Sequence, residues 1–111
     1  MRKITEQSLN AFLNHRNFKK DNTEVKRYNL EGEYALYLFG NRIAWWKSGK
    51  IWISNRGYFT QTTKERLNAL PNVHIIQKKG EWYLNGVYWN GNPICVDCVV
   101  ETFDLRIDGD S

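Results

Sequence analysis

The sequence has few of the cysteines that cross-link small secreted proteins through disulfide bonds. It has two cysteines, Cys95 and Cys98, among 111 residues. One pair is too few for a disulfide framework, so we expect a reduced, intracellular protein with inert thiols. Their C-x-x-C spacing supplies half of a zinc site, and the two histidines, His15 and His74, lie far away in the sequence. We therefore predict no metal site and no cofactor.

Long hydrophobic runs are also missing. The longest run is a few residues, which excludes a membrane-spanning helix, and residues 1–12 lack the apolar stretch of a secretory signal. Because 41% of the residues are apolar and 14% are aromatic, the chain can still fold. We expect a single cytoplasmic domain over residues 1–111, with a core at about 4–103 and an acidic tail at 104–111.

Acidic residues are scarce in the first 79 positions, which carry fifteen Lys/Arg and six Asp/Glu. Residues 80–111 carry one Arg and six Asp/Glu, so the net charge of +4 divides into a basic part and an acidic part. Two interpretations are open. The basic part forms a binding face, or the charges are an ordinary solvated surface that segregates along the chain.

The first predicted helix covers residues 5–14. Thr5 is a plausible N-cap, and Glu6 in the first turn suits the helix dipole. Leu9, Phe12 and Leu13 follow at helical spacing and predict a stripe that packs on the core. Residues 15–22 are polar and basic and indicate a loop.

The second predicted helix covers residues 62–70. Thr62 and Glu65 match a capping box, with Thr62 as N-cap. Pro71 should end the helix. Leu67 and Leu70 would then face the core, while the polar side chains point outward, among them Lys64, Arg66 and Asn68.

The remaining chain reads as short strands joined by tight turns. We predict an outer strand at 23–30 and a meander at 34–39, 42–46 and 51–54. A second meander is predicted at 73–78, 81–84 and 87–89, and a last strand within 94–103. The predicted fold class is α+β, with one or more antiparallel meander sheets on which an N-terminal helix and a short central helix pack.

Turn positions fix the expected registers. A two-residue loop at Gly40-Asn41 would pair Tyr37 with Ala44, and one at Ser48-Gly49 would pair Trp46 with Ile51. In the second meander, the turns agree on one buried face, made of Val73, Ile75, Trp82, Leu84, Val87 and Trp89. We expect Trp46, Trp82, Leu84 and Trp89 in the core.

Three segments resemble a family of small uncharacterised proteins from tailed bacteriophages: GNRIAWW, KIWISNRGYFTQTTKERLNALPNV and HIIQKKGEWYLNGVYWNG. Its members share a strand ending in IAW, an ISxxGxxTxTTKxRLN element and a QKKGxWYLNGxxWxG element. The resemblance covers about residues 35–91, and the chain after Asn92 lies outside it. It implies a phage origin and a host cytoplasm, and it supplies no catalytic residues.

The sequence holds no catalytic signature, so we expect a binding protein and not an enzyme. The favoured hypothesis is recognition of a host protein, whose activity is blocked, because exposed Trp, Tyr and Arg anchor interfaces. The alternative is a nucleic-acid-binding module with aromatic platforms in a basic groove. Both use the same candidate residues: Trp45, Lys47, Lys50, Trp52, Arg56, Tyr58, Lys64 and Arg66. Trp45 and Trp52 should lie opposite each other on the sheet. They would form the centre of the binding surface if their face of the sheet stays open.

Overall fold

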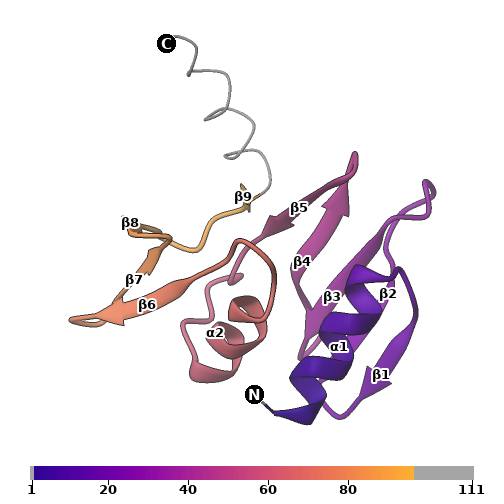
Figure 1. Cartoon of the computed structure of the whole chain (residues 1–111), viewed down its shortest axis with the longest axis horizontal. Coiled ribbons are helices and arrows are strands. Elements are labelled where there is room, and N and C mark those ends of the chain that lie inside the picture. Colours follow the sequence, from indigo (N-terminus) through magenta and orange to yellow (C-terminus); the bar gives the residue numbers. More distant parts are fainter. Residues whose placement is uncertain (1, 97–111) are drawn as a thin grey trace, which may run out of the picture.

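The computed structural model describes residues 2–96. Two helices and nine strands follow one another along the chain (Figure 1): α1 (Lys3–Leu13), β1 (Phe18–Lys20), β2 (Thr23–Arg27), β3 (Tyr34–Leu38), β4 (Asn41–Lys47), β5 (Lys50–Ile53), α2 (Gln61–Asn68), β6 (Ile75–Lys78), β7 (Glu81–Leu84), β8 (Val87–Tyr88) and β9 (Ile94–Cys95). The predicted α+β class, with an N-terminal helix and a short central one, is confirmed.

The strands form two antiparallel sheets, and each of the two predicted meanders lies in its own sheet. One has six strands in the order β1-β2-β3-β4-β5-β9, and the other has three in the order β6-β7-β8. Two expectations about single segments are wrong. The segment expected to be a loop at 15–22 contributes β1, and the predicted outer strand, β2, lies inside the sheet between β1 and β3. β1 forms because Phe18 pairs with Val25 and packs against the core.

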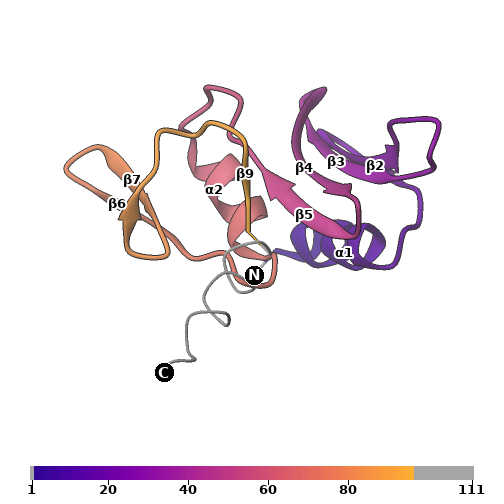
Figure 2. The ribbon, with the colours of Figure 1, turned by 90° about the horizontal axis from the view of Figure 1, so that it is seen from above.

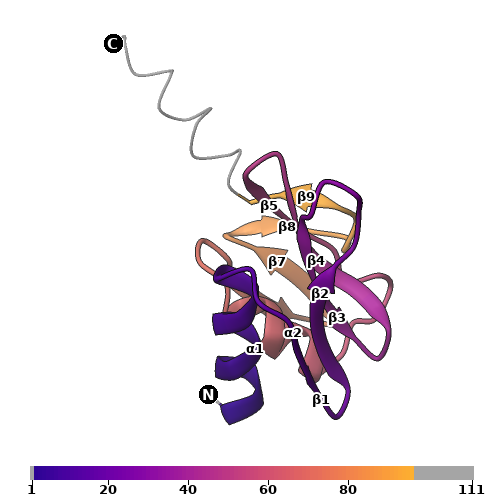
Figure 3. The same ribbon diagram turned by 90° about the vertical axis from the view of Figure 1, so that its right-hand side faces the viewer.

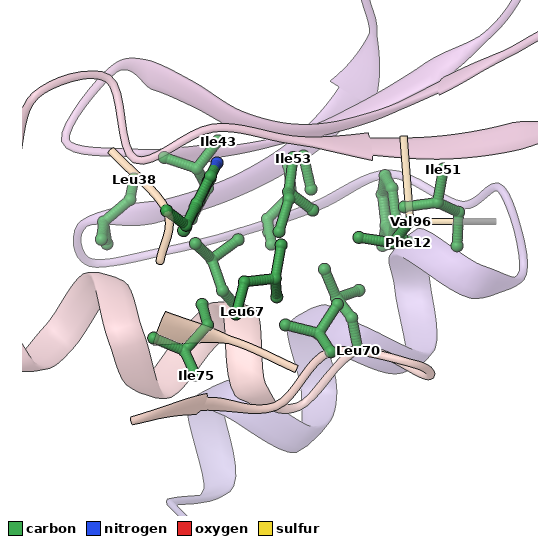
Figure 4. Packing of buried hydrophobic residues seen from close by; sticks show 14 of the residues in the cluster. Phe12, Leu38, Ile43, Ile51, Ile53, Leu67, Leu70, Ile75 and Val96 are labelled. Atoms are coloured by element: carbon green, nitrogen blue, oxygen red, sulfur yellow. The ribbon is translucent and has the colours of Figure 1, made fainter. Parts of the chain in front are cut away.

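Both helices pack on one face of the six-stranded sheet. Figures 2 and 3 show α1 along this face, and α2 lies between the sheet and the β6–β7 hairpin. The core fills the space between them (Figure 4), where Phe12 of α1 and Leu67 of α2 meet Ile53 of β5, and each of the three is fully buried. One core therefore joins both sheets.

The turns of the meanders share one chemistry, a residue with positive φ followed by glycine. Ser48-Gly49, Lys79-Gly80 and Asn85-Gly86 have this form at the expected places. The first hairpin differs, because its turn is Phe39-Gly40 and not Gly40-Asn41. Tyr37 then pairs with Arg42, and a bulge beside Leu36 leaves Ala44 opposite Leu36. The expected pairing of Tyr37 with Ala44 is wrong, whereas Trp46 does pair with Ile51.

Both helices start earlier than predicted, α1 at Lys3 by two residues and α2 at Gln61 by one. α2 is capped by Thr60, whose hydroxyl accepts a hydrogen bond from the Thr63 amide, and Thr62 is not the N-cap. Glu65 does not close a capping box, because its carboxylate pairs with Arg2 at 2.7 Å. In α1 the N-cap position is Arg2, and the expected cap, Thr5, is buried inside the helix.

The second sheet buries most of its expected face. Trp82, Leu84 and Trp89 are in the core, as predicted, but Val87 is 68% exposed. β8 has only two residues, and nothing among residues 2–96 covers its end at Val87. Trp46 is partly buried, and its indole N–H donates to the Phe12 carbonyl at 3.0 Å.

Candidate binding surfaces

The first candidate surface is the face of the six-stranded sheet that points away from the helices, which we call the outer face. Side chains alternate along a strand, so the strand registers decide which residues lie on it. The registers place these side chains there: Lys19, Glu24, Lys26, Tyr37, Arg42, Trp45, Lys47, Lys50 and Trp52. Four of the eight predicted site residues, Trp45, Lys47, Lys50 and Trp52, are thus brought together, and Trp45 pairs with Trp52 as expected.

Arg42 covers the centre of the outer face. Its guanidinium lies 4.6 Å from the ring centroid of Trp45 and 4.6 Å from that of Tyr28. Tyr28 is held in place because its hydroxyl donates a 2.6 Å hydrogen bond to the Trp46 carbonyl. Trp45 is only 6% exposed as a result. The expectation that both tryptophans stay open as platforms is therefore wrong for Trp45, whose ring already binds a cation.

Two lysines, Lys26 and Lys47, make similar cation–π contacts on the outer face. The Lys26 ammonium lies 5.1 Å from the centroid of the Tyr37 ring, and that of Lys47 lies 5.5 Å from the Trp52 ring. Each such pair contributes about 0.5–1 kcal/mol at an exposed site. That energy is too small to explain the fold, but it is enough to keep the cations close to the sheet.

Glu33 closes the end of the outer face at the β2–β3 turn. Its carboxylate accepts hydrogen bonds from the Asn29 amide at 2.8 Å and the Ser48 backbone N–H at 2.7 Å. These two bonds, in that order, lower the pKa of the Glu33 carboxyl. Burial, followed by the charge of Glu33, raises the pKa of the Tyr28 hydroxyl. The carboxylate therefore stabilises the β2–β3 turn through these hydrogen bonds.

Lys64 and Arg66 do not join the outer face, contrary to expectation. α2 lies on the opposite face of the sheet, where Lys64 donates to the Gln77 side chain at 3.2 Å. Arg66 is 2% exposed and donates to the Thr5 and Thr23 hydroxyls, at 2.6 and 3.3 Å. Burial lowers the pKa of its guanidinium. Arg66 is a structural residue, and its partners are too distant in sequence for a local pattern to reveal them.

The second candidate surface is an apolar pocket between the β3–β4 turn and the start of α2, which we call the aromatic pocket. It has a volume of about 230 Å³ and is lined by Leu38, Phe39, Asn41, Ile43, Tyr58, Thr60 and Thr63. Phe39 and Tyr58 stand at its rim, 70% and 52% exposed. Phe59, next in the chain, is 47% exposed and makes an edge contact with Trp82.

Two predicted site residues belong to this region. Tyr58 lines the pocket, and Arg56 lies in the turn before it, where the Asn55 side chain accepts from the Gly57 amide. Phe39 was not among the predicted site residues, because the expected strand at 34–39 ended on it. The form of the other turns, a residue followed by glycine, was the signal that would have assigned Phe39-Gly40 to the turn and its ring to the surface.

Other kinds of site find little support in residues 2–96. No group of three or more His, Cys, Asp or Glu side chains in this part lies close enough together to hold a metal ion. No helix in the same part is long and apolar enough to cross a membrane. Cys95 is disulfide-bonded, so the expected inert thiol is wrong at this position, while Cys98 lies outside the described residues.

Comparison with known proteins identifies a family. A model of the family described as Kyanoviridae Gp96 protein matches residues 1–103, well beyond the segment 35–91 that carried the resemblance. The searches of curated proteins and of solved structures each found no match. The match supports the phage origin implied by the sequence, and the family's function is unknown.

Proposed function

The chain belongs to the Kyanoviridae Gp96 family of phage proteins, and from this premise we propose that it is a non-catalytic protein that binds a host protein. Binding takes place at the aromatic pocket and modulates or blocks the activity of the partner in the host cytoplasm. The observation that carries this proposal is the position of Phe39, a large aromatic residue that is both exposed and strained.

Phe39 is unfavourable to the isolated protein in two ways. Its side chain is 70% exposed, and its φ of 52° lies in the left-handed region, which costs a residue with a side chain about 1–2 kcal/mol. Asn, Asp or Gly would form the same turn more easily. The turn requires this conformation but not a phenylalanine, and backbone strain of this kind often persists at binding sites. A partner that covers the ring would compensate for its exposure.

The chemistry of the pocket fits an inserted apolar side chain. Leu38 and Ile43 form its apolar part, and among the seven lining residues only Tyr58 is titratable. An apolar pocket rimmed by aromatic rings is typical of the anchoring sites of protein interfaces. The hydroxyl groups of Tyr58, Thr60 and Thr63 have no His, Asp, Glu or Lys beside them among the lining residues to act as a general base, so the proposal does not include turnover.

A pull-down from host lysate tests the proposal. Tagged wild-type protein should retain a host protein with and without nuclease, and Phe39→Asn should lose it. Val87→Thr is the matched control, because Val87 is equally exposed on the other sheet. If Phe39→Asn retains the partner as well as Val87→Thr does, the aromatic pocket is not the binding site. If nuclease releases the partner, the proposed protein recognition is wrong.

A further inference from the structure

Two Asn-Gly dipeptides occur in the chain, Asn85-Gly86 between β7 and β8 and Asn90-Gly91 in the connection from β8 to β9. Asparagine before glycine loses its side-chain amide readily, because glycine has no side chain to shield its backbone nitrogen from the amide carbon. We propose that Asn90-Gly91 is a modification site, which deamidates spontaneously in the folded protein, while Asn85-Gly86 is protected. The reaction involves no host protein, so this inference does not depend on the proposed function.

The reaction uses only the chain and water. The Gly91 backbone nitrogen gives its proton to water or hydroxide and attacks Cγ of Asn90, so that an N–Cγ bond forms. The Cγ–Nδ2 bond then breaks, and Nδ2 takes up a proton and leaves as ammonia. The result is a cyclic succinimide, which water opens at one of its two carbonyl groups. One opening gives aspartate at position 90, and the other gives isoaspartate, whose main chain runs through the β carbon.

The Asn85 side chain is held away from its glycine. Its Oδ1 accepts a hydrogen bond from the His74 backbone N–H at 2.9 Å, and its Nδ2 donates to the Asn72 carbonyl at 2.9 Å. The backbone N–H of Asn85 also donates to the His74 carbonyl at 2.8 Å. The whole amide is therefore bound to the segment that precedes β6. Both side-chain hydrogen bonds must break before the amide carbon can reach the Gly86 nitrogen.

The Asn90 side chain is exposed and lies in a conformation that favours the attack. Its Oδ1 accepts a hydrogen bond at 3.0 Å from the Asn92 backbone N–H, two residues further on. This bond folds the side chain over the following peptide, which contains the Gly91 nitrogen. The same N–H points at the oxygen on which negative charge develops during the attack. Neither the attacking nitrogen nor the leaving Nδ2 donates to any group among residues 2–96, so both are free to react.

The isoaspartate product should weaken the loop that holds β9. Gly91 is buried, and its carbonyl accepts hydrogen bonds from the Asn55 backbone N–H at 3.1 Å and the Ser54 hydroxyl at 2.8 Å. These bonds join the end of β5 to the segment that leads into β9. Isoaspartate adds one methylene to the main chain directly before Gly91. Position 91 has no room for even a Cβ, which would overlap the Asn55 side chain, so the added atom should displace Gly91 and break these bonds.

Peptide mapping by mass spectrometry tests the inference on the full chain, incubated for days at mildly alkaline pH. Exchange of the amide NH2 for OH should accumulate at Asn90 about tenfold faster than at Asn85, whose side chain must first release two hydrogen bonds. In concentrated urea, where the native hydrogen bonds are lost, the two rates should become similar. Equal rates in the folded protein would overturn the inference, as would a faster rate at Asn85. The absence of deamidation at Asn90 in the folded protein, while both sites react in urea, would also overturn it.

Two variants complete the test. Asn90→Ser removes the amide and keeps an oxygen that accepts from the Asn92 N–H, so it should abolish the mass change at position 90 and leave the rate at Asn85 unchanged. Asn90→Asp supplies the aspartate product alone and, freshly prepared, should melt like fresh wild type. The deamidated fraction of aged wild type, separated by ion exchange, also contains isoaspartate and should melt lower by about 4 °C or more. A fraction that melts like fresh Asn90→Asp would overturn the predicted effect on the loop.

Discussion

The Nη1 atom of Arg66 donates a 2.6 Å hydrogen bond to the hydroxyl of Thr5, across 61 positions of sequence. The two residues join α2 to α1 and are 2% and 1% exposed. The guanidinium also donates to Thr23 of β2 and lies 3.3 Å from the Glu65 carboxylate. One buried cation thus ties both helices to the six-stranded sheet, at the place where the sequence predicted an N-cap and a solvated arginine.

Replacing Arg66 should destabilise the protein although the charge is kept. Arg66→Lys should lower the free energy of unfolding by about 1–3 kcal/mol, because an ammonium cannot reach both hydroxyls in the fixed geometry of a guanidinium. Urea unfolding measures the change. Arg56→Lys, at an exposed position, should change the free energy by less than about 0.5 kcal/mol. Equal effects of the two substitutions would show that the Arg66 network is not needed for stability.

Glu65 should make stability depend on pH in the acid range. The hydrogen bond from Arg2, together with the nearby charges of Arg2 and Arg66, lowers the pKa of its carboxyl below the ordinary value of 4.5. A carboxyl with a depressed folded pKa stabilises the protein above the unfolded pKa. This contribution is lost as pH falls through the folded value. The melting temperature of the wild type should therefore fall more steeply between about pH 5 and pH 3 than that of Glu65→Gln. Parallel curves for the two proteins would exclude the effect.

Gly91 should tolerate no side chain. A Cβ there would lie 2.1 Å from Oδ1 of Asn55, which is fully buried, and the Gly91 carbonyl accepts hydrogen bonds from the Asn55 amide and the Ser54 hydroxyl. Gly91→Ala should cost about 1–3 kcal/mol more than Gly57→Ala, since overpacking adds to the shared cost of positive φ. Gly57 is the matched control, because its φ is similar, +86° against +91°, and a Cβ there would meet nothing within 4 Å. Equal costs in denaturant unfolding would mean that Asn55 moves aside freely.

Trp82 should be needed for its volume and not for its N–H group. Its side chain is 1% exposed, and its indole nitrogen has no hydrogen-bond partner among the described residues. Trp82→Ala should cost about 3–5 kcal/mol because it leaves a large cavity. Trp82→Phe should cost much less, since it removes an unpaired donor along with part of the ring. If Phe were as costly as Ala, the nitrogen would have a partner that we have missed.

The parts that sequence predicted well are those in which one local signal determines the structure. The Lys79-Gly80 turn fixes the β6–β7 hairpin, so Lys78 pairs with Glu81 as expected. Ser48-Gly49 does the same for Trp45 and Trp52. In the first hairpin, Gly40 is compatible with two turns, Phe39-Gly40 and Gly40-Asn41. The structure uses Phe39-Gly40, so the predicted register of β3 and β4 is wrong. No local pattern reveals the bulge beside Leu36.

The candidate site was harder to predict because burial is a property of the whole fold. Trp45 and Trp52 were placed on the correct face, but nothing local showed that Arg42 would cover Trp45. Helical spacing places Arg66 on a side of α2 that the sequence predicts to be exposed. It is buried only because α1 and β2 bring Thr5 and Thr23 to it. The pattern of a helix shows which residues share a side, and tertiary contacts decide which sides are covered.

Substituting Phe39 should separate stability from function. Phe39→Asn removes an aromatic ring from a left-handed turn position and supplies a residue that adopts this conformation readily. We expect the free energy of unfolding to rise by about 0.5–1 kcal/mol, while binding of the host protein is lost. Ser48→Asn is the matched control, at the equivalent position of the next hairpin with φ 53°. It should stabilise the protein similarly and leave the partner bound.

Thermal unfolding and the pull-down, measured on the same preparations, decide the outcome. A less stable Phe39→Asn would mean that the ring supports the packing of Leu38 and Ile43, which line the same pocket. Its exposure would then need no partner to explain it. A more stable variant that no longer binds would show that the wild-type protein keeps an unfavourable residue because its partner requires it.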